Sequence, residues 1–223
     1  MKVSIFKHPI EVTNRLAERA TSKELLLAML DAMVTAKSEC TDNDPSGSRG
    51  WRAWQMGTRR NREVHVGVGD WAKDNTDQVP SIVSKKLGIR IVVCNTDDGT
   101  CVDASSPQNS SKKGVGNERA VDANQLSFID QLEAPAGRVV PFSRITTSAG
   151  PVVTYYFCAH IEGDDVRAEL SCPTSFESGY FSEFVERIYI VGGDTPLDDG
   201  TKKKSSGDGD SEYDIPVKLK RKN

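Results

Sequence analysis

Several features that define large classes of protein are missing from this chain. It contains no run of about 18 apolar residues, which a membrane-spanning helix requires, and residues 1–10 hold too short an apolar stretch for a signal peptide. Its five cysteines are scattered without a Cys-x-x-Cys pair, which argues against a disulfide framework and against a zinc ribbon. The formal net charge is -3, so the whole molecule is not a basic nucleic-acid coat. We therefore expect a cytoplasmic protein with no membrane partner.

What the chain does contain is typical of a globular protein. Of its 223 residues, 37% are hydrophobic and 27% are charged, which suffices for one core without a metal or disulfide staple. We predict one α+β (mixed α/β) domain over residues 1–193, with a central, mostly antiparallel sheet packed by a few helices. Residues 194–223 hold acids and bases in alternating blocks and few apolar side chains, which predicts a disordered charged tail. Within this tail, residues 213–217 (Tyr-Asp-Ile-Pro-Val) suit docking as an extended peptide, so one hypothesis is a protein partner bound through the tail.

Periodicity and turn residues place the elements of the domain. A helix over 22–38 is predicted by apolar residues at helical spacing after a capping box formed by Thr21 and Glu24. A β-branched, almost continuously apolar run predicts a central strand over 89–94. The other expected elements are helices over 12–19, 79–87 and 118–132, strands over 63–68, 152–161, 165–172 and 186–191, and a long polar loop over 95–116.

The most distinctive local composition lies between residues 49 and 62. This stretch has no acid and contains five arginines and two tryptophans: Arg49, Trp51, Arg52, Trp54, Arg59, Arg60 and Arg62. Arginine donates paired hydrogen bonds to phosphate, and a tryptophan face can stack on a base, so a flexible stretch of this kind suits a single-stranded nucleic-acid groove. The plainer alternative is that the tryptophans anchor the core while the arginines are solvated at the surface or pair with acids.

A second basic stretch supports the same hypothesis. Lys112 and Lys113 stand beside Gly114 and Gly116, just ahead of the predicted helix over 118–132, as in an anion-binding turn. The spacing fits neither a Walker A loop nor a dinucleotide-binding glycine motif. If this loop and the arginine-tryptophan stretch share one face, a nucleic-acid-binding accessory protein is the leading hypothesis.

The second hypothesis is a metal-dependent hydrolase or nuclease. Glu63 and His65 would point to the same face of the predicted 63–68 strand, and Asp70 follows closely. A divalent metal is the one cofactor that this pattern suggests. No strand carries the acid, spacer and Glu-x-Lys order of a PD-(D/E)xK nuclease, because the hairpin offers Arg167-Ala168-Glu169 without the lysine.

A less favoured enzyme hypothesis rests on a cysteine. The sequence Asp98-Gly99-Thr100-Cys101 resembles the Asp-Gly-x-Cys motif that opens the nucleophile site of ovarian-tumour-type cysteine peptidases. The resemblance implies a thiolate at Cys101, activated by a histidine that a third polar group orients. His160 and Glu162 are the candidates for these two roles.

Overall fold

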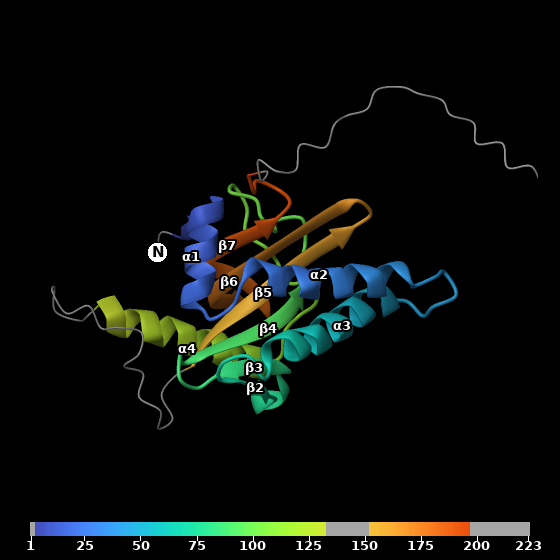
Figure 1. Ribbon diagram of the computed structural model, residues 1–223. Helices are drawn as coiled ribbons and strands as arrows, with labels where there is room; N and C mark the ends of the chain where they lie inside the picture. Colours follow the sequence, from blue (N-terminus) through green and yellow to red (C-terminus); the bar gives the residue numbers. More distant parts are fainter. Residues whose placement is uncertain (1–2, 133–151, 197–223) are drawn as a thin grey trace, which may run out of the picture.

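The computed structural model describes residues 3–132 and 152–196. Its centre is a seven-stranded mixed sheet with the strand order β1-β7-β6-β5-β4-β3-β2 (Figure 1). The strands are β1 (Ser4–Phe6), β2 (Trp71–Asp74), β3 (Ser81–Ser84), β4 (Ile89–Asn95), β5 (Val153–Glu162), β6 (Asp165–Glu177) and β7 (Tyr180–Val191), and the helices are α1 (Pro9–Glu18), α2 (Lys23–Ser38), α3 (Ser48–His65) and α4 (Val115–Leu132). Four strand pairings are antiparallel, and the pairs β1–β7 and β4–β5 are parallel. The predicted fold class, a mixed α+β domain with a mostly antiparallel sheet, is confirmed.

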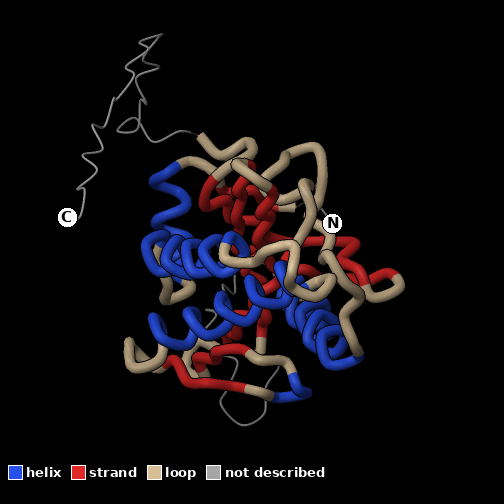
Figure 2. Tube along the Cα trace, turned by 90° about the vertical axis from the view of Figure 1, so that its right-hand side faces the viewer, coloured by secondary structure: helices blue, strands red, loops and turns tan. Residues whose placement is uncertain are grey.

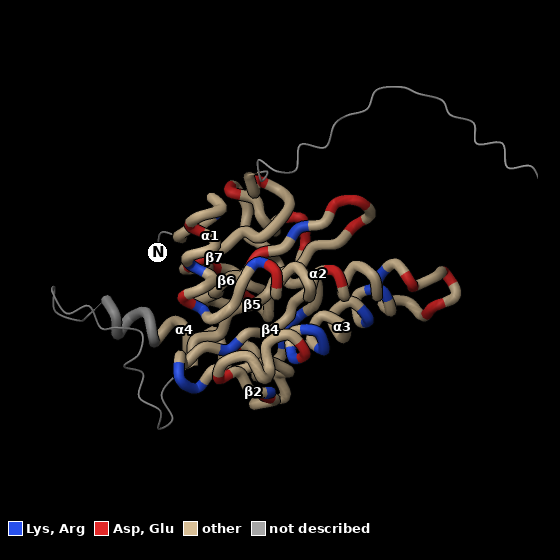
Figure 3. Tube along the Cα trace, viewed as in Figure 1, with Lys and Arg blue, Asp and Glu red and all other residues tan. Residues whose placement is uncertain are grey.

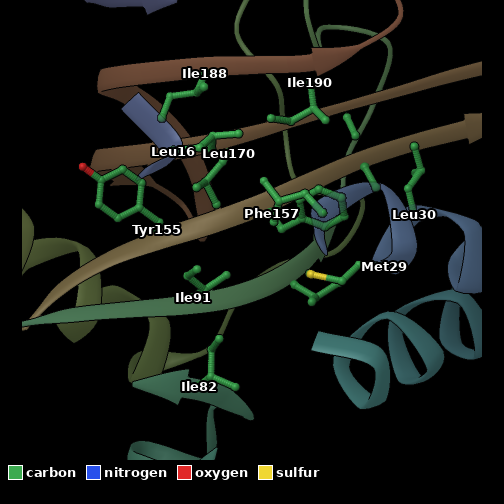
Figure 4. Close-up of a cluster of buried hydrophobic side chains, with 14 of the residues drawn as sticks. Leu16, Met29, Leu30, Ile82, Ile91, Tyr155, Phe157, Leu170, Ile188 and Ile190 are labelled. Atoms are coloured by element: carbon green, nitrogen blue, oxygen red, sulfur yellow. The ribbon is translucent and has the colours of Figure 1, made fainter. Parts of the chain in front are cut away.

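Helices cover both faces of the sheet, which runs through the middle of the molecule (Figure 2). Because side chains alternate along a strand, Ile91 and Val93 of β4 join the apolar cluster under α1, α2 and α3. The intervening residues Val92 and Cys94 join a second cluster with Val121 of α4. This two-sided burial explains why the 89–94 run is apolar almost without interruption. Figure 4 shows the larger cluster, in which Met29 and Leu30 of α2 meet Phe157 and Ile91 of the sheet.

Two predicted elements were wrong in type, and both corrections have a physical reason. Residues 63–68 do not form a strand, because α3 continues to His65, with Ala53, Gly57 and Asn61 buried at helical spacing. Residues 79–87 do not form a helix, because Ser81–Ser84 pair as β3 with both β2 and β4. Hydrogen bonding to a strand on each side outweighs the residues at the ends of that segment, which are typical of helix boundaries.

The other predicted elements are present, but β6 ends five residues later than predicted and β7 starts six residues earlier, and the short strands β1 and β2 were not predicted. The long helix starts one residue later than expected, at Lys23, and its cap is Ser22, whose hydroxyl accepts a hydrogen bond from the Leu25 N–H at 3.4 Å. The predicted hairpin is formed by β5 and β6, which pair from Tyr156 opposite Ser171 to Glu162 opposite Asp165. Asp194 to Pro196 are described, and the rest of the predicted tail lies outside the described residues.

A proline inside the sheet is compensated by a helix side chain. Pro173 of β6 stands where the β5–β6 ladder would continue opposite Thr154, and proline has no N–H to donate. The amide of Asn124, fully buried on α4, donates to the carbonyls of Thr154 and Pro173 and accepts from the Thr154 N–H at 2.7 Å. Asn124 therefore satisfies the backbone groups that the interrupted ladder leaves over, and it fixes α4 on the sheet.

Candidate nucleic-acid interface

The arginine-tryptophan stretch is the helix α3 and not a flexible segment. It packs closely on α2 and β4 because residue 57 is glycine: a Cβ there would lie 2.6 Å from Cγ of Met33 and 3.0 Å from a methyl group of Val93. One face of α3 is therefore committed to the core. The basic and aromatic side chains occupy the remaining faces.

The start of α3 is open to a ligand. Its N-cap is Gly47, at a φ of 85°, so no side chain caps the first turn, and that turn contains no acid. The N–H groups of Arg49 and Gly50 consequently have no acceptor within the helix. The side-chain amide of Asn95, at the end of β4, donates to the Gly50 carbonyl at 2.7 Å and ties the start of α3 to the sheet.

The loop between β4 and α4 is held in place by its own amide side chains. Asn109 donates to the Gly179 carbonyl and accepts from the Phe181 N–H at 2.9 Å, so this part of the loop lies against the β6–β7 turn. The Lys113 N–H donates to the same Gly179 carbonyl at 3.0 Å. Ser110, Ser111 and Lys113 are thus presented at a fixed place.

A buried ion pair anchors the other end of this loop. Glu169 of β6 and Arg187 of β7, both almost completely buried, lie 2.7 Å apart. The Arg187 guanidinium also donates to the carbonyls of Gly99, Val102 and Ser105. Its pKa is raised, because the hydrogen bond and charge of Glu169 outweigh the effect of burial, which alone would lower it. Such a pair is costly to break, since loss of one partner leaves an uncompensated buried charge.

These two supports bring the two predicted basic segments together. A groove of about 460 Å³ lies between the start of α3 and the loop, and Trp51, Trp54, Ser110, Ser111 and Lys113 are among its lining residues. Trp51 is 57% exposed, whereas Trp54 is half-buried and packs on the core. We call this the tryptophan groove. It opens beside a second hollow of about 660 Å³ at the ends of β4 and β5, with which it shares Gly50, Asn95 and Ser110.

Lys113 lines the tryptophan groove, and two further cations lie near it. The Lys113 ammonium lies beside the Cys94 thiol, whose pKa burial raises and Lys113 counteracts. Lys112 is exposed on the same loop. Arg49 pairs with Asp42 at 3.2 Å, but both side chains are largely exposed, so this pair contributes little and can be exchanged for a ligand phosphate.

The other predicted arginines lie further along α3, whose Lys and Arg positions are blue in Figure 3. Each of them has a partner within the protein. Arg52 pairs with Glu39, and Arg59 and Arg60 both pair with Glu63. These exposed pairs face α2 and not the tryptophan groove.

Arg62 serves the fold. Its guanidinium donates to the carbonyl of Asp74 at 2.9 Å, to the side chain of Asn75 at 2.6 Å and to the carbonyl of Ser81 at 3.4 Å. It thereby ties the end of α3 to β2 and β3. Arg59 and Arg60 thus follow the plainer alternative, in which arginines pair with acids, whereas Arg62 binds two carbonyls and the Asn75 side chain.

The residues of the cysteine-hydrolase hypothesis are not arranged for nucleophilic catalysis. Cys101 has no exposed surface, its thiol donates to the Ala168 carbonyl at 3.0 Å, and its pKa is raised well above the usual range, mainly by burial. A reactive thiol needs the opposite conditions. His160 lies 3.5 Å from the carboxylate of Asp165 in the hairpin, whereas Glu162 is exposed at the rim of the second hollow.

The predicted metal ligands are also separated by the structure. Glu63 is exposed on α3 and bonded to arginines, whereas the fully buried His65 ring contacts the Thr21 hydroxyl at 2.8 Å and the Asn61 carbonyl at 3.0 Å. Burial lowers the His65 pKa, so the ring is a neutral structural group. Asp70 accepts from the Ser84 hydroxyl and the Lys86 N–H. Over residues 3–132 and 152–196, no group of three His, Cys, Asp or Glu side chains is placed to hold a metal.

Sequence reasoning missed part of the groove lining. Asn95 carries no motif, and the signal that could have found it is its place at the carboxyl end of a buried strand, where ligands of α/β sheets gather.

Comparisons with protein-family models, with curated proteins and with solved structures gave no match. None of the helices in the described part of the chain combines the length and the apolar character needed to cross a bilayer. The functional argument therefore rests on the geometry of the tryptophan groove.

Proposed function

We propose that this protein binds single-stranded nucleic acid in the tryptophan groove, without catalysing a reaction there. One observation carries the proposal: two segments that are far apart in the sequence, one bearing Trp51 and Trp54 and the other Ser110 to Lys113, line the same groove. Each segment alone is weak evidence. Together they supply an aromatic platform and cations at one place, which is the combination that single-strand binders use.

The groove offers a separate partner for each part of a nucleotide. The exposed face of Trp51 suits stacking with a base, while Trp54, packed on the core, fixes the floor. Lys113 suits phosphate oxygens, as does Arg49 from the adjoining second hollow, and the hydroxyls of Ser110 and Ser111 are further donors. None of these contacts reads a base edge, so we expect little sequence preference.

A single strand fits these groups better than a duplex does. In a duplex the base faces are stacked on one another, and a tryptophan reaches them only after they are unstacked. The exposed Asp42 and the half-buried Asp44, next to the start of α3, also oppose a large polyanionic surface. We therefore expect a small footprint with few phosphate contacts.

The test is a titration of fluorescently labelled single-stranded DNA, single-stranded RNA and duplex DNA at two salt concentrations, with anisotropy as the readout. The wild-type chain is expected to bind both single strands more tightly than the duplex. Lys113→Gln should weaken binding, and loss of one phosphate contact should flatten the slope of log K against log salt by about 0.7. The matched control is Lys73→Gln, which removes the same charge from an exposed position on β2, away from the groove.

Two results would contradict the proposal. One is the absence of binding to all three nucleic acids at low salt. The other is an equal loss of affinity in Lys113→Gln and Lys73→Gln, which would mean that binding follows net charge and not the groove.

A further inference from the structure

The tryptophan groove is short compared with a nucleic-acid strand. Its volume of about 460 Å³ lies in the range of pockets that enclose one small molecule, about 300–1,000 Å³. A strand of several nucleotides must therefore leave the groove past one of its neighbours. These neighbours are the loop before α3, the second hollow at the ends of β4 and β5, and the loop over 110–113.

Two of these neighbours carry acids. The loop before α3 holds Asp42 and Asp44 around a hollow of about 260 Å³, which shares Gly47 with the groove. The second hollow is lined by the carboxylates of Asp98 and Glu162. Figure 3 shows acids in red at the α2–α3 loop and at the β5–β6 turn. A phosphate that leaves the groove in either direction is therefore opposed by negative charge.

The loop over 110–113 is the remaining direction, and it carries no acid. Residues 104–117 contain Lys112 and Lys113 but neither Asp nor Glu. Lys113 lines the groove, and Lys112 is exposed beside it in the sequence. A strand that leaves along this loop has cations beside its phosphates. One favourable direction out of the groove suits a strand that is held by its end.

The side chains that remain free in the second hollow are hydrogen-bond acceptors. Lys37 donates to a carbonyl of β5, Arg49 pairs with an acid of the loop before α3, and Asp97 accepts from N–H groups of its own loop. The carboxylates of Asp98 and Glu162 are exposed, and neither has a hydrogen bond or an ion pair within the part of the chain that the structure describes. The hollow therefore has two carboxylates to offer to a ligand.

Arg167 of β6 brings these two carboxylates to one place. Its guanidinium donates to the Asp98 carbonyl at 2.6 Å and pairs with Asp165, also at 2.6 Å. Asp165 stands opposite Glu162 in the β5–β6 ladder. The loop after β4 is thus fastened to the hairpin that carries Glu162.

Two free carboxylates suit a ligand that donates hydrogen bonds and has no phosphate at that point. The 3′ end of an RNA strand is such a ligand, because its neighbouring 2′- and 3′-hydroxyls can both donate. Hydrogen bonds from hydroxyls to a carboxylate are charge-assisted and strong. A 3′-phosphate or a further nucleotide would instead bring negative charge against both acids.

We infer that the protein binds the 3′ end of single-stranded RNA. The last base stacks on Trp51, its phosphate lies at Lys113, and its 2′,3′-diol donates to Asp98 and Glu162. The rest of the strand leaves past Lys112. This inference rests on the proposed function, since it uses the same groove, and it adds the end of the strand and the kind of sugar that are recognised.

The test uses one single-stranded RNA sequence, labelled at its 5′ end and made with either a 2′,3′-diol or a 3′-phosphate at its 3′ end. In anisotropy titrations, the full-length chain should bind the diol strand at least about tenfold more tightly, because charge-assisted hydrogen bonds are replaced by repulsion in the other strand. An unlabelled circular RNA of the same sequence has no end, and it should compete much more weakly than the unlabelled diol strand.

A double variant shows whether the two carboxylates are responsible. Asp98→Asn/Glu162→Gln keeps the size of both side chains and removes their charge, so the preference for the diol should largely disappear and the 3′-phosphate strand should gain affinity. The matched control is Glu11→Gln/Asp122→Asn, which removes two exposed carboxylates from α1 and α4. The control should keep the full preference.

The possible results separate this inference from the proposed function. No binding of either linear RNA would contradict both. Equal affinity for the diol strand, the 3′-phosphate strand and the circle would support the groove but overturn the recognition of an end. A weak circle with a tight 3′-phosphate strand would place the 5′ end in the site. An unchanged preference in Asp98→Asn/Glu162→Gln would show that these carboxylates do not contact the diol.

Discussion

In the first half of α3, two tryptophans line a groove, and Trp51 exposes more than half of its surface. In the second half, Arg62 donates to three oxygens of the β2–β3 region, and Asn61 and His65 are buried against the core. The helix is basic and polar along its whole length. The difference therefore comes from what each half faces: the end of β4 and an open loop on one side, and the β2–β3 hairpin on the other. Composition alone would assign both halves to one binding surface.

The largest effect is expected from a change in the first half of α3, which lines the tryptophan groove. Trp51→Ala removes an exposed stacking platform and should cost about 1–3 kcal/mol of binding free energy for single strands, which is roughly a 5- to 150-fold loss of affinity. Because Trp51 is largely exposed, the free energy of unfolding should change little. Anisotropy titrations and denaturant melts measure the two quantities. Trp51→Phe should recover part of the affinity, and a full loss there would count against stacking.

The next largest effect is expected from a change in the second half of α3, which stabilises the fold. Arg62→Met keeps an apolar stem but removes the donors to Asp74, Asn75 and Ser81, so the free energy of unfolding should fall by about 1–3 kcal/mol. Affinity for single strands, measured well below the melting transition, should stay close to that of the wild type. A loss of affinity as large as that of Trp51→Ala would show that the two halves act as one surface.

A smaller effect concerns pH. Burial lowers the His65 pKa in the folded state, so the unfolded chain binds the proton more readily. His65 therefore contributes full stability above the unfolded pKa of about 6.5 and loses it as the pH falls from there toward the folded pKa. In denaturant melts from pH 8 to pH 5, His65→Gln should show a flatter dependence over the acidic part of the range. Parallel curves for the two proteins would contradict the neutral, buried ring.

The smallest effect is expected at Arg59 and Arg60. Both are exposed and bonded to Glu63, and surface pairs of this kind contribute about 0–1 kcal/mol. The double change Arg59→Ala/Arg60→Ala should therefore leave stability nearly unchanged and reduce affinity only through the long-range loss of charge. Measured against Lys113→Gln in anisotropy titrations, a larger loss in the double variant would move the binding surface to the α2–α3 side.

Local sequence patterns correctly predicted those helices and strands whose burial follows a simple, regular pattern along the chain. The 89–94 strand is buried on both faces, so its β-branched run could be identified from the sequence, and the 22–38 helix carries a regular apolar stripe. The type of 79–87 could not be predicted, because its strand character comes from partners on β2 and β4. The helix α3 was missed because its buried positions include Thr58, Asn61 and His65, which carry no apolar pattern.

The candidate site was predictable only in pieces. Trp51 and Trp54 and the lysines of the loop stand out by composition, but their meeting depends on Asn109, which holds the loop against the β6–β7 turn. That contact joins residues far apart in sequence, and no local pattern encodes it. For the same reason, the sequence could not tell which arginines lie near the groove and which stabilise the fold.

The most direct test of the groove is photo-crosslinking of the full-length chain to a single strand that carries 5-iodouracil, followed by mass spectrometry of the crosslinked peptides. If the strand binds in the tryptophan groove, crosslinks should form at Trp51 or Trp54 and in the loop 110–113. In Trp51→Ala the crosslinks on α3 should be lost. Crosslinks confined to residues 59–62 of α3, or to the basic run 218–222, would contradict binding in this groove.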